Sequence, residues 1–240
     1  MTCRSHTFEK YKEFPISYQY KPVIPTVMDD VLDGTDIVAW QFPDLDLCDW
    51  LYDKIKTIHE EGNTTEGVVA GGLDPKQKKS NEVLTDIQEV NPQNKCWPTE
   101  LDGPTAYIFQ WLQSCLLEYK KMNPMIIHSP WSWEGGGCQF QYYEPGQGFF
   151  TQHFERAAPT IHGGLLREAV WMMYLNDIDE TDAEGDPIGG THFPQQKVTI
   201  PCKKGLTLFW PAGWTYPHVG SVTDKNDKLI ATGWMGPVIN

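Results

Sequence analysis

The periodicity of apolar side chains changes near residue 124 of this 240-residue chain, and that change limits the possible folds more than any other feature. Before it, the segments 44–61 and 102–122 place apolar residues at helical spacing. After it, short runs rich in β-branched and aromatic residues alternate with Gly, Pro, Asp and Asn. The sequence therefore predicts an α+β protein in which N-terminal helices support a C-terminal sandwich or jelly roll.

The ends of these segments carry the expected residues. Segment 44–61 opens with acidic side chains and is followed by Gly62, and segment 102–122 opens with a Gly-Pro pair. Residues 67–84, rich in Gly and Lys, are expected to form a mobile loop with a short strand. The predicted strands are 138–143, 168–175, 197–201, 205–211 and 228–235. We expect one compact domain, with 1–123 as the support region and 124–240 as the β core.

Composition excludes several classes of protein. The formal charge of −13 disfavours binding to nucleic acid and by itself suits a basic or neutral polypeptide partner better. No apolar run approaches the roughly 18 residues that a membrane span needs. The N-terminus lacks the apolar core of a secretory signal, and the six cysteines show no CxxC spacing. The expected protein is soluble and cytoplasmic, with reduced thiols and without a membrane or nucleic-acid partner; its oligomeric state is left open.

A candidate metal site lies in the run QYYEPGQGFFTQHFE, residues 141–155. His153 and Glu155 are two positions apart, so on a strand both side chains point to the same face. His218, beside another β-type run, can supply a second imidazole. Two histidines and one carboxylate that leave open positions form the usual Fe(II) site of non-haem oxygenases. An HxE pair alone is also common by chance, and the alternative is a solvent-facing histidine near a surface acid.

Lys228, ten residues after His218, begins the apolar run 228–235. A dicarboxylate that binds a metal by one end requires a cation beneath its other end, and a lysine at the start of a buried strand meets that need. The alternative is an edge-strand lysine that extends into water. Four further side chains are expected to face the same interior, either bonding that carboxylate or packing as core residues: Tyr143, Tyr174, Thr232 and Trp234.

Together these motifs resemble the 2-oxoglutarate/Fe(II) oxygenase superfamily, in its prolyl 4-hydroxylase-like branch. That branch has a Tyr–Gly turn, an HxD strand, a YLN strand, a GGxTxF segment, a K/R-G-x-L-x-x-F run, a distal His, and a Lys or Arg with a Trp six residues later. The matching residues here are Tyr143–Gly146, His153–Glu155, Tyr174–Asn176, Gly189–Phe193, Lys204–Gly205, His218, Lys228 and Trp234. The resemblance covers residues 138–235. One position departs from it, because Glu155 stands where the branch has Asp.

The resemblance implies a double-stranded β-helix, a cupin-like jelly roll, that carries an oxidoreductase site. It implies that His153, Glu155 and His218 bind Fe(II) as the catalytic centre. Tyr143, Tyr174, Lys228, Thr232 and Trp234 would bind 2-oxoglutarate. Such a dioxygenase consumes O2, releases succinate and CO2, and hydroxylates its substrate. A peptidyl proline or similar residue is the favoured substrate, and a free amino acid or small metabolite is the alternative.

Several other side chains permit two interpretations. His162 and His192 are rival metal ligands, although surface or substrate contacts suit both better. Arg156 can hold an acidic group of the substrate or form a surface salt bridge. The remaining aromatics either line a substrate groove or pack in the core: Trp131, Trp133 and Trp214.

Two other classes of protein share this kind of barrel. One is a jelly-roll binding module without turnover, which the complete triad together with Lys228 disfavours. The other is a cupin-like metal enzyme that uses no cosubstrate. Such an enzyme needs no dicarboxylate pocket, so Lys228 and the two tyrosines argue against it.

Overall fold

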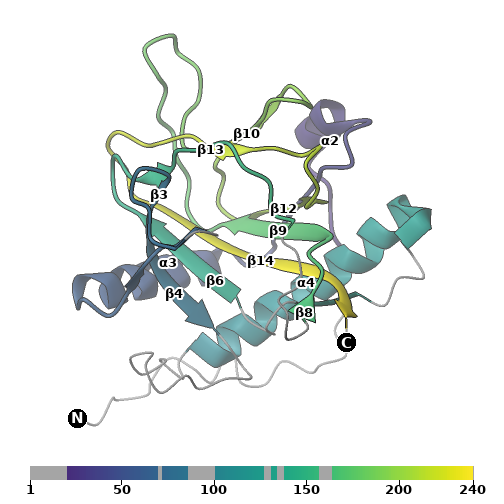
Figure 1. Cartoon of the computed structure of the whole chain (residues 1–240), viewed down its shortest axis with the longest axis horizontal. Coiled ribbons are helices and arrows are strands. Elements are labelled where there is room, and N and C mark those ends of the chain that lie inside the picture. Colours follow the sequence, from purple (N-terminus) through teal and green to yellow (C-terminus); the bar gives the residue numbers. More distant parts are fainter. Residues whose placement is uncertain are drawn as a thin grey trace.

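The computed structural model describes residues 21–69, 72–85, 101–126, 131–133, 138–156 and 164–239. Its centre is a large antiparallel sheet in the order β1-β12-β9-β14-β6-β4-β2, with β5 and β8 also paired to β14 (Figure 1). These strands are β1 (Val38–Gln41), β2 (Thr65–Glu66), β4 (Asn81–Thr85), β5 (Trp131–Trp133), β6 (Cys138–Tyr143), β8 (Gly164–Leu165), β9 (Ala169–Tyr174), β12 (Leu206–Pro211) and β14 (Lys228–Ile239).

Two smaller sheets complete the β structure. One has the order β11-β10-β13, and the other is a ribbon of β3 and β7. Their strands are β10 (Thr191–Phe193), β11 (Val198–Ile200), β13 (Val219–Gly220), β3 (Lys78–Lys79) and β7 (Gly148–Phe149). Phe193 and Ile200 of the three-stranded sheet share a buried cluster with Met172, Leu208 and Ile230 of the large sheet. The two sheets therefore face each other across an apolar interior, as the layers of a jelly roll do.

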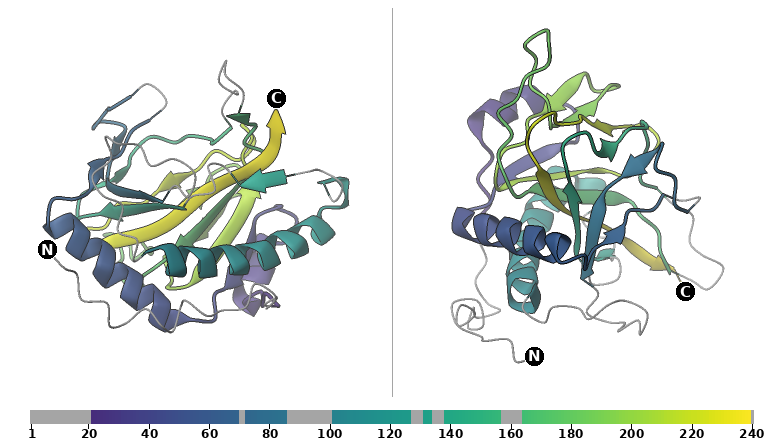
Figure 2. Two further views of the ribbon diagram at one scale, coloured as in Figure 1. Left: turned by 90° about the horizontal axis from the view of Figure 1, so that it is seen from below. Right: turned by 90° about the vertical axis from the view of Figure 1, so that its left-hand side faces the viewer.

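Helices cover the opposite face of the large sheet. They are α3 (Leu45–Glu60) and α4 (Asp102–Met122), which lie along one face in Figure 2, and α4 is followed by the short helix η2 (Pro124–Ile126). The short helix α2 (Thr26–Leu32) instead adds Met28 and Leu32 to the jelly-roll cluster. Helix α3 begins where the Asp44 side chain accepts a hydrogen bond from the Leu47 backbone N–H at 3.1 Å. The apolar sides of α3 and α4 share a second cluster with Phe140, Trp171 and Phe209 of the sheet. Strand alternation thus directs one set of side chains to the helices and the other to the jelly-roll interior.

The predicted α+β jelly roll is confirmed, as are both long helices. The short strand expected within 67–84 is present, because β4 pairs with β6 and buries Glu82 and Val83. Strand β1 was not expected from the sequence, and it pairs with β12 from within the predicted support region. The division at residue 123/124 stays a prediction. None of the helices described is long and apolar enough to cross a membrane.

Candidate active site

Backbone pairing brings the two histidines of the predicted triad together. The His153 N–H donates to the His218 carbonyl at 3.0 Å, and the His218 N–H donates to the His153 carbonyl at 2.8 Å. The Glu155 N–H donates to the Ala212 carbonyl at 3.2 Å. Two segments more than 55 residues apart in the chain are therefore held side by side.

The side chains of the triad converge on one point. Their ligand atoms lie within 4.8 Å of one another. Oε1 of Glu155 lies 3.2 Å from Nε2 of His153 and 3.6 Å from Nε2 of His218. Burial raises the pKa of the Glu155 carboxyl, but hydrogen bonds from the two imidazoles outweigh it and hold that pKa well below its ordinary value. The carboxyl is therefore the anionic member of the cluster.

The outer nitrogens of both rings are already engaged. Nδ1 of His153 lies 2.9 Å from the Thr151 carbonyl, and Nδ1 of His218 lies 3.1 Å from the Tyr216 carbonyl. A carbonyl only accepts, so each Nδ1 carries a hydrogen, and each Nε2 would bind a metal ion through its lone pair once it gives up the hydrogen that it donates to Glu155. The Phe149 ring also stacks on His153 at 3.6 Å between centroids. Two oriented nitrogen donors and one carboxylate fit a divalent iron ion.

Trp234 lies against the metal triad and contacts Glu155 directly. Its indole N–H donates to Oε2 of Glu155 at 2.9 Å, which leaves Oε1 facing the histidines. Arg167 covers the Trp234 ring at 3.6 Å and lies 3.8 Å from the same Oε2. Both contacts restrain the longer glutamate arm. Arg167 was not predicted as a site residue because it lies outside every motif of the resemblance.

Lys228 is buried at the wall of a cavity of about 950 Å³ that the triad also lines. Its side chain is 6% exposed, and its Nζ lies 5.7 Å from the Tyr143 ring and 5.8 Å from the Tyr174 ring. Among the residues that the structure describes, no carboxylate pairs with this ammonium. Burial lowers the pKa of Lys228, which the nearby Cys202 only partly offsets. A buried cation without a counter-ion is costly, and an anionic ligand would relieve that cost.

Two other predicted cosubstrate residues line the same cavity. The Tyr143 hydroxyl donates to Oε1 of Gln141 at 2.5 Å, and the Thr232 hydroxyl donates to the Trp171 carbonyl at 2.8 Å. Gln141 alternates with Tyr143 on β6 and lines the cavity as well. The alternation of Gln141 with Tyr143 in a predicted strand is the sequence signal that could have identified Gln141 as a residue of the cavity.

Tyr174 is close to Lys228 but lies behind the cavity wall. Its hydroxyl is 2.7 Å from that of Thr191, and it is Thr191 that lines the cavity. Trp210 is a further wall residue, and its buried indole N–H has no hydrogen-bond partner among the described residues. The GGxTxF motif contained Thr191, but sequence alone did not assign it a contact.

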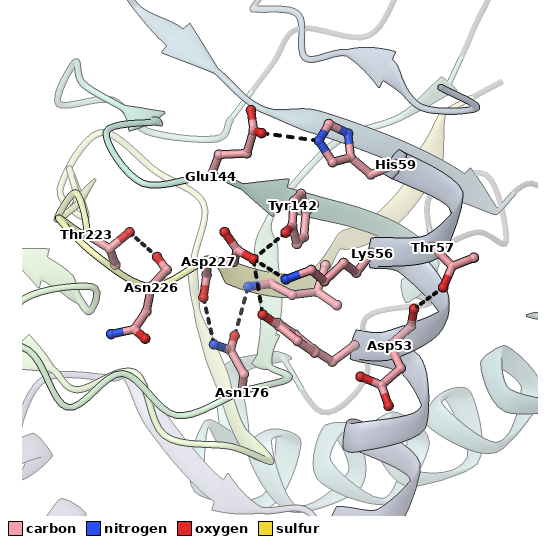
Figure 3. A network of polar contacts seen from close by, with 12 residues as sticks. Asp53, Lys56, Thr57, His59, Tyr142, Glu144, Asn176, Thr223, Asn226 and Asp227 are labelled. Carbon is pink, nitrogen blue, oxygen red and sulfur yellow. Dashed lines mark hydrogen bonds and ion pairs between the residues drawn. The ribbon is translucent and has the colours of Figure 1, made fainter. Parts of the chain in front are cut away.

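Asn176 holds the backbone on both sides of Lys228. Its Nδ2 donates to the Asp227 carbonyl at 2.8 Å, and its Oδ1 accepts from the Leu229 N–H at 2.9 Å (Figure 3). The amide thereby extends the pairing between β9 and β14 past the end of β9. It restrains the residue that carries the buried ammonium.

The Asp227 side chain attaches the same point to helix α3. One carboxylate oxygen accepts from Lys56 Nζ at 2.8 Å and from the Tyr142 hydroxyl at 2.5 Å (Figure 3). Burial raises the pKa of the Asp227 carboxyl, but these hydrogen bonds outweigh burial and hold the pKa below its ordinary value. The carboxyl is therefore ionised at neutral pH. The support helix is thus bonded directly to the start of β14.

The remaining expected side chains lie elsewhere. His192 is exposed, lies outside the triad cluster, and has Nδ1 2.9 Å from the Thr199 hydroxyl. His162 lies outside the described residues. Arg156 is exposed and lines the cavity. None of the three tryptophans lines the cavity. Trp131 and Trp133 pack beside α4, and Trp214 is 68% exposed.

Comparison with known proteins assigns this arrangement to a class. Residues 138–236 match the model of the 2OG-Fe(II) oxygenase superfamily. A search of curated protein sequences found no match. The matched segment, about two-fifths of the chain, contains the His-Glu-His cluster and Lys228, so this segment is similar to that superfamily. The protein is therefore an enzyme whose cofactors are Fe(II), 2-oxoglutarate and O2.

Solved structures with a similar fold include prolyl hydroxylases. A Pseudomonas putida prolyl-4-hydroxylase is similar at a TM-score of 0.59 and 16% identity, with 88% of this chain and 97% of that chain covered. A viral collagen prolyl hydroxylase from Paramecium Bursaria Chlorella virus-1, in a 2-oxoglutarate complex, has a TM-score of 0.55 at 21% identity over 87% and 99%. A Trichoplax adhaerens prolyl hydroxylase in complex with a hypoxia inducible factor peptide has a TM-score of 0.60 at 13% identity over 86% of each chain.

Proposed function

We propose that this enzyme hydroxylates a residue of a polypeptide, with proline the favoured target, and that it releases succinate and CO2. The observation that carries the proposal is the buried Lys228 ammonium, which shares a cavity with the His-Glu-His cluster and has no carboxylate partner among the described residues. The similar structures include a collagen prolyl hydroxylase and a peptide complex, which supports a peptide substrate.

In this proposal each side chain has a defined task. His153, Glu155 and His218 hold Fe(II), and Lys228 binds the distal carboxylate of 2-oxoglutarate. When bound, the iron with its cosubstrate and O2 supplies the oxidising chemistry. The cavity wall near Lys228 includes Met172, Trp210 and Ile230, which exclude water from the reacting centre.

Cosubstrate turnover tests the metal assignment. Purified protein with Fe(II), 2-oxoglutarate and O2 is expected to form succinate, and His153→Ala is expected to form none because one imidazole ligand is lost. His192→Ala is the matched control, since it removes an exposed imidazole outside the cluster. Binding of Mn(II) and 2-oxoglutarate without oxygen is measured in parallel, because turnover without substrate is slow. Neither succinate nor binding by the wild type would refute the proposal.

Asn176→Ala is expected to weaken 2-oxoglutarate binding about tenfold without changing Mn(II) affinity. The substitution removes two hydrogen bonds that flank Lys228, each contributing about 0.5–1.5 kcal/mol. Isothermal titration of the Mn(II)-loaded protein without oxygen measures both affinities. Asn123→Ala, which removes a hydrogen bond to the Tyr119 carbonyl at the end of α4, is the control. Equal cosubstrate affinity in the two variants would contradict the assigned positioning role.

A further inference from the structure

Two hydroxyl groups that the resemblance assigns to cosubstrate binding already donate their hydrogens elsewhere. The Tyr143 hydroxyl donates to Oε1 of Gln141 at 2.5 Å, and the Thr232 hydroxyl donates to the Trp171 carbonyl at 2.8 Å. Burial raises the pKa of the Tyr143 phenol, which therefore keeps its hydrogen. A hydroxyl carries only one hydrogen, so neither group has one left for a carboxylate beside Lys228.

The Gln141 amide keeps an unused donor at the cavity. Its side chain is 7% exposed and lines the cavity. Because Oε1 accepts the Tyr143 hydrogen, the orientation of the amide is fixed and Nε2 carries the two donor hydrogens. Among the residues that the structure describes, Nε2 has no hydrogen-bond partner. The neighbouring Gln139 differs, since its Nε2 already donates to Glu82 at 2.5 Å. An unpaired buried donor is costly, and a ligand acceptor would remove that cost.

The sheet register places this amide between Lys228 and the metal cluster. Alternate positions of β6 and β14 face the cavity as three cross-strand pairs, and all six side chains line it. In order along β14, the pairs are Lys228–Tyr143, Ile230–Gln141 and Thr232–Gln139. Trp234, the next position on this face of β14, donates to Glu155 of the metal cluster. A dicarboxylate that reaches from the metal to Lys228 therefore passes beside Gln141.

Building on the proposed function, we propose that Nε2 of Gln141 donates a hydrogen bond to the distal carboxylate of 2-oxoglutarate, beside the Lys228 ammonium. The distal end is the one concerned, because Tyr143, which holds the amide, pairs with Lys228 and has its ring 5.7 Å from Nζ. One ammonium and one amide donor together give each carboxylate oxygen a partner. Tyr143 is then a positioning residue that acts through Gln141.

Two related 2-oxo acids test the contact. Isothermal titration of the Mn(II)-loaded protein without oxygen compares 2-oxoglutarate with 2-oxopentanoate, which has the same 2-oxo acid end but no distal carboxylate. Gln141→Met is expected to weaken 2-oxoglutarate binding at least about tenfold, because a hydrogen bond to a charged group is lost. Its affinities for 2-oxopentanoate and Mn(II) should be unchanged, which also shows that the variant is folded. Gln113→Met, at an exposed position of α4, is the matched control.

Two further variants separate the donor from the contact that orients it. Gln141→Glu keeps an oxygen that accepts the Tyr143 hydrogen but replaces the donor with a carboxylate, so 2-oxoglutarate binding should fall further than in Gln141→Met. Tyr143→Phe leaves Nε2 in place and removes only its orientation, so the loss should be smaller than in Gln141→Met. If Tyr143 contacted the carboxylate directly, Tyr143→Phe would cause the larger loss.

Several results would overturn the inference. They are wild-type affinity for 2-oxoglutarate in Gln141→Met or Gln141→Glu, an equal loss of affinity for both 2-oxo acids, or a larger loss in Tyr143→Phe than in Gln141→Met. Failure of the proposed function is distinguishable, because the wild type would then bind 2-oxoglutarate not at all or no more tightly than 2-oxopentanoate.

Discussion

Lys228→Met is expected to abolish 2-oxoglutarate binding and to raise the free energy of unfolding of the ligand-free protein by about 1–3 kcal/mol. The ammonium is 6% exposed, and two aromatic rings but no carboxylate among the described residues contact it, so in the absence of ligand the burial of its charge opposes folding. Methionine has a similar length and no charge. A gain in stability together with a loss of binding is the signature of a residue kept for its ligand.

Denaturant unfolding and anaerobic titration with 2-oxoglutarate measure the two effects. Lys121→Met, at an exposed position on α4, is the control and should leave both quantities unchanged. A variant that binds 2-oxoglutarate as tightly as wild type would show that the cosubstrate pocket is wrongly placed, even with an intact metal site. A less stable variant would show that the lysine has an unrecognised partner.

The same lysine makes the stability and the binding depend on pH in opposite directions. Burial lowers its pKa below the ordinary lysine value, so between the two values the unfolded chain binds more protons than the folded one. Stability of the ligand-free protein therefore rises with pH through that window. Affinity for 2-oxoglutarate falls over the same window, because the dicarboxylate needs the charged form. Lys228→Met should lose both dependences.

Glu155→Ala is expected to lower the affinity for Mn(II) at least about 100-fold, because even groups that only support a metal ligand alter affinity 10- to 100-fold. The substitution removes the anionic member of the cluster, which lies 3.2 Å and 3.6 Å from the two imidazole nitrogens. Cosubstrate affinity should fall with it, since 2-oxoglutarate chelates the same metal. Competition against a fluorescent metal indicator measures the loss.

Glu155→Asp distinguishes the charge of this residue from its reach. Aspartate keeps the charge but is one methylene shorter, so it cannot contact both Trp234 and the histidines as Glu155 does. We expect a metal affinity between those of wild type and Glu155→Ala. Glu144→Ala, which removes a partly exposed carboxylate 3.5 Å from His59, is the control. Wild-type affinity in Glu155→Ala would exclude this glutamate as a ligand.

Local patterns were enough to predict the two long helices and the strands that carry the site. Helical spacing in 44–61 and 102–122 and alternation in 138–143 and 228–235 depend only on neighbouring residues. Strand β1 was not predicted because its four residues, VAWQ, are too few to show the alternation of apolar and polar side chains that marks a strand. A short strand was expected within 67–84, but its bounds could not be given, since β4 buries the polar Glu82 through a pairing with Lys78.

The sequence alone predicted the core of the candidate site, because a strand places positions i and i+2 on one face and so put Glu155 with His153 and Thr232 with Lys228. Only the tertiary structure decided their contacts. Trp234 bonds Glu155, and Tyr174 bonds Thr191 behind the cavity wall. The cavity lining also includes Arg167, which no motif contains. Such contacts join residues from separate strands and loops, and their distances depend on how whole layers pack, which no local pattern records.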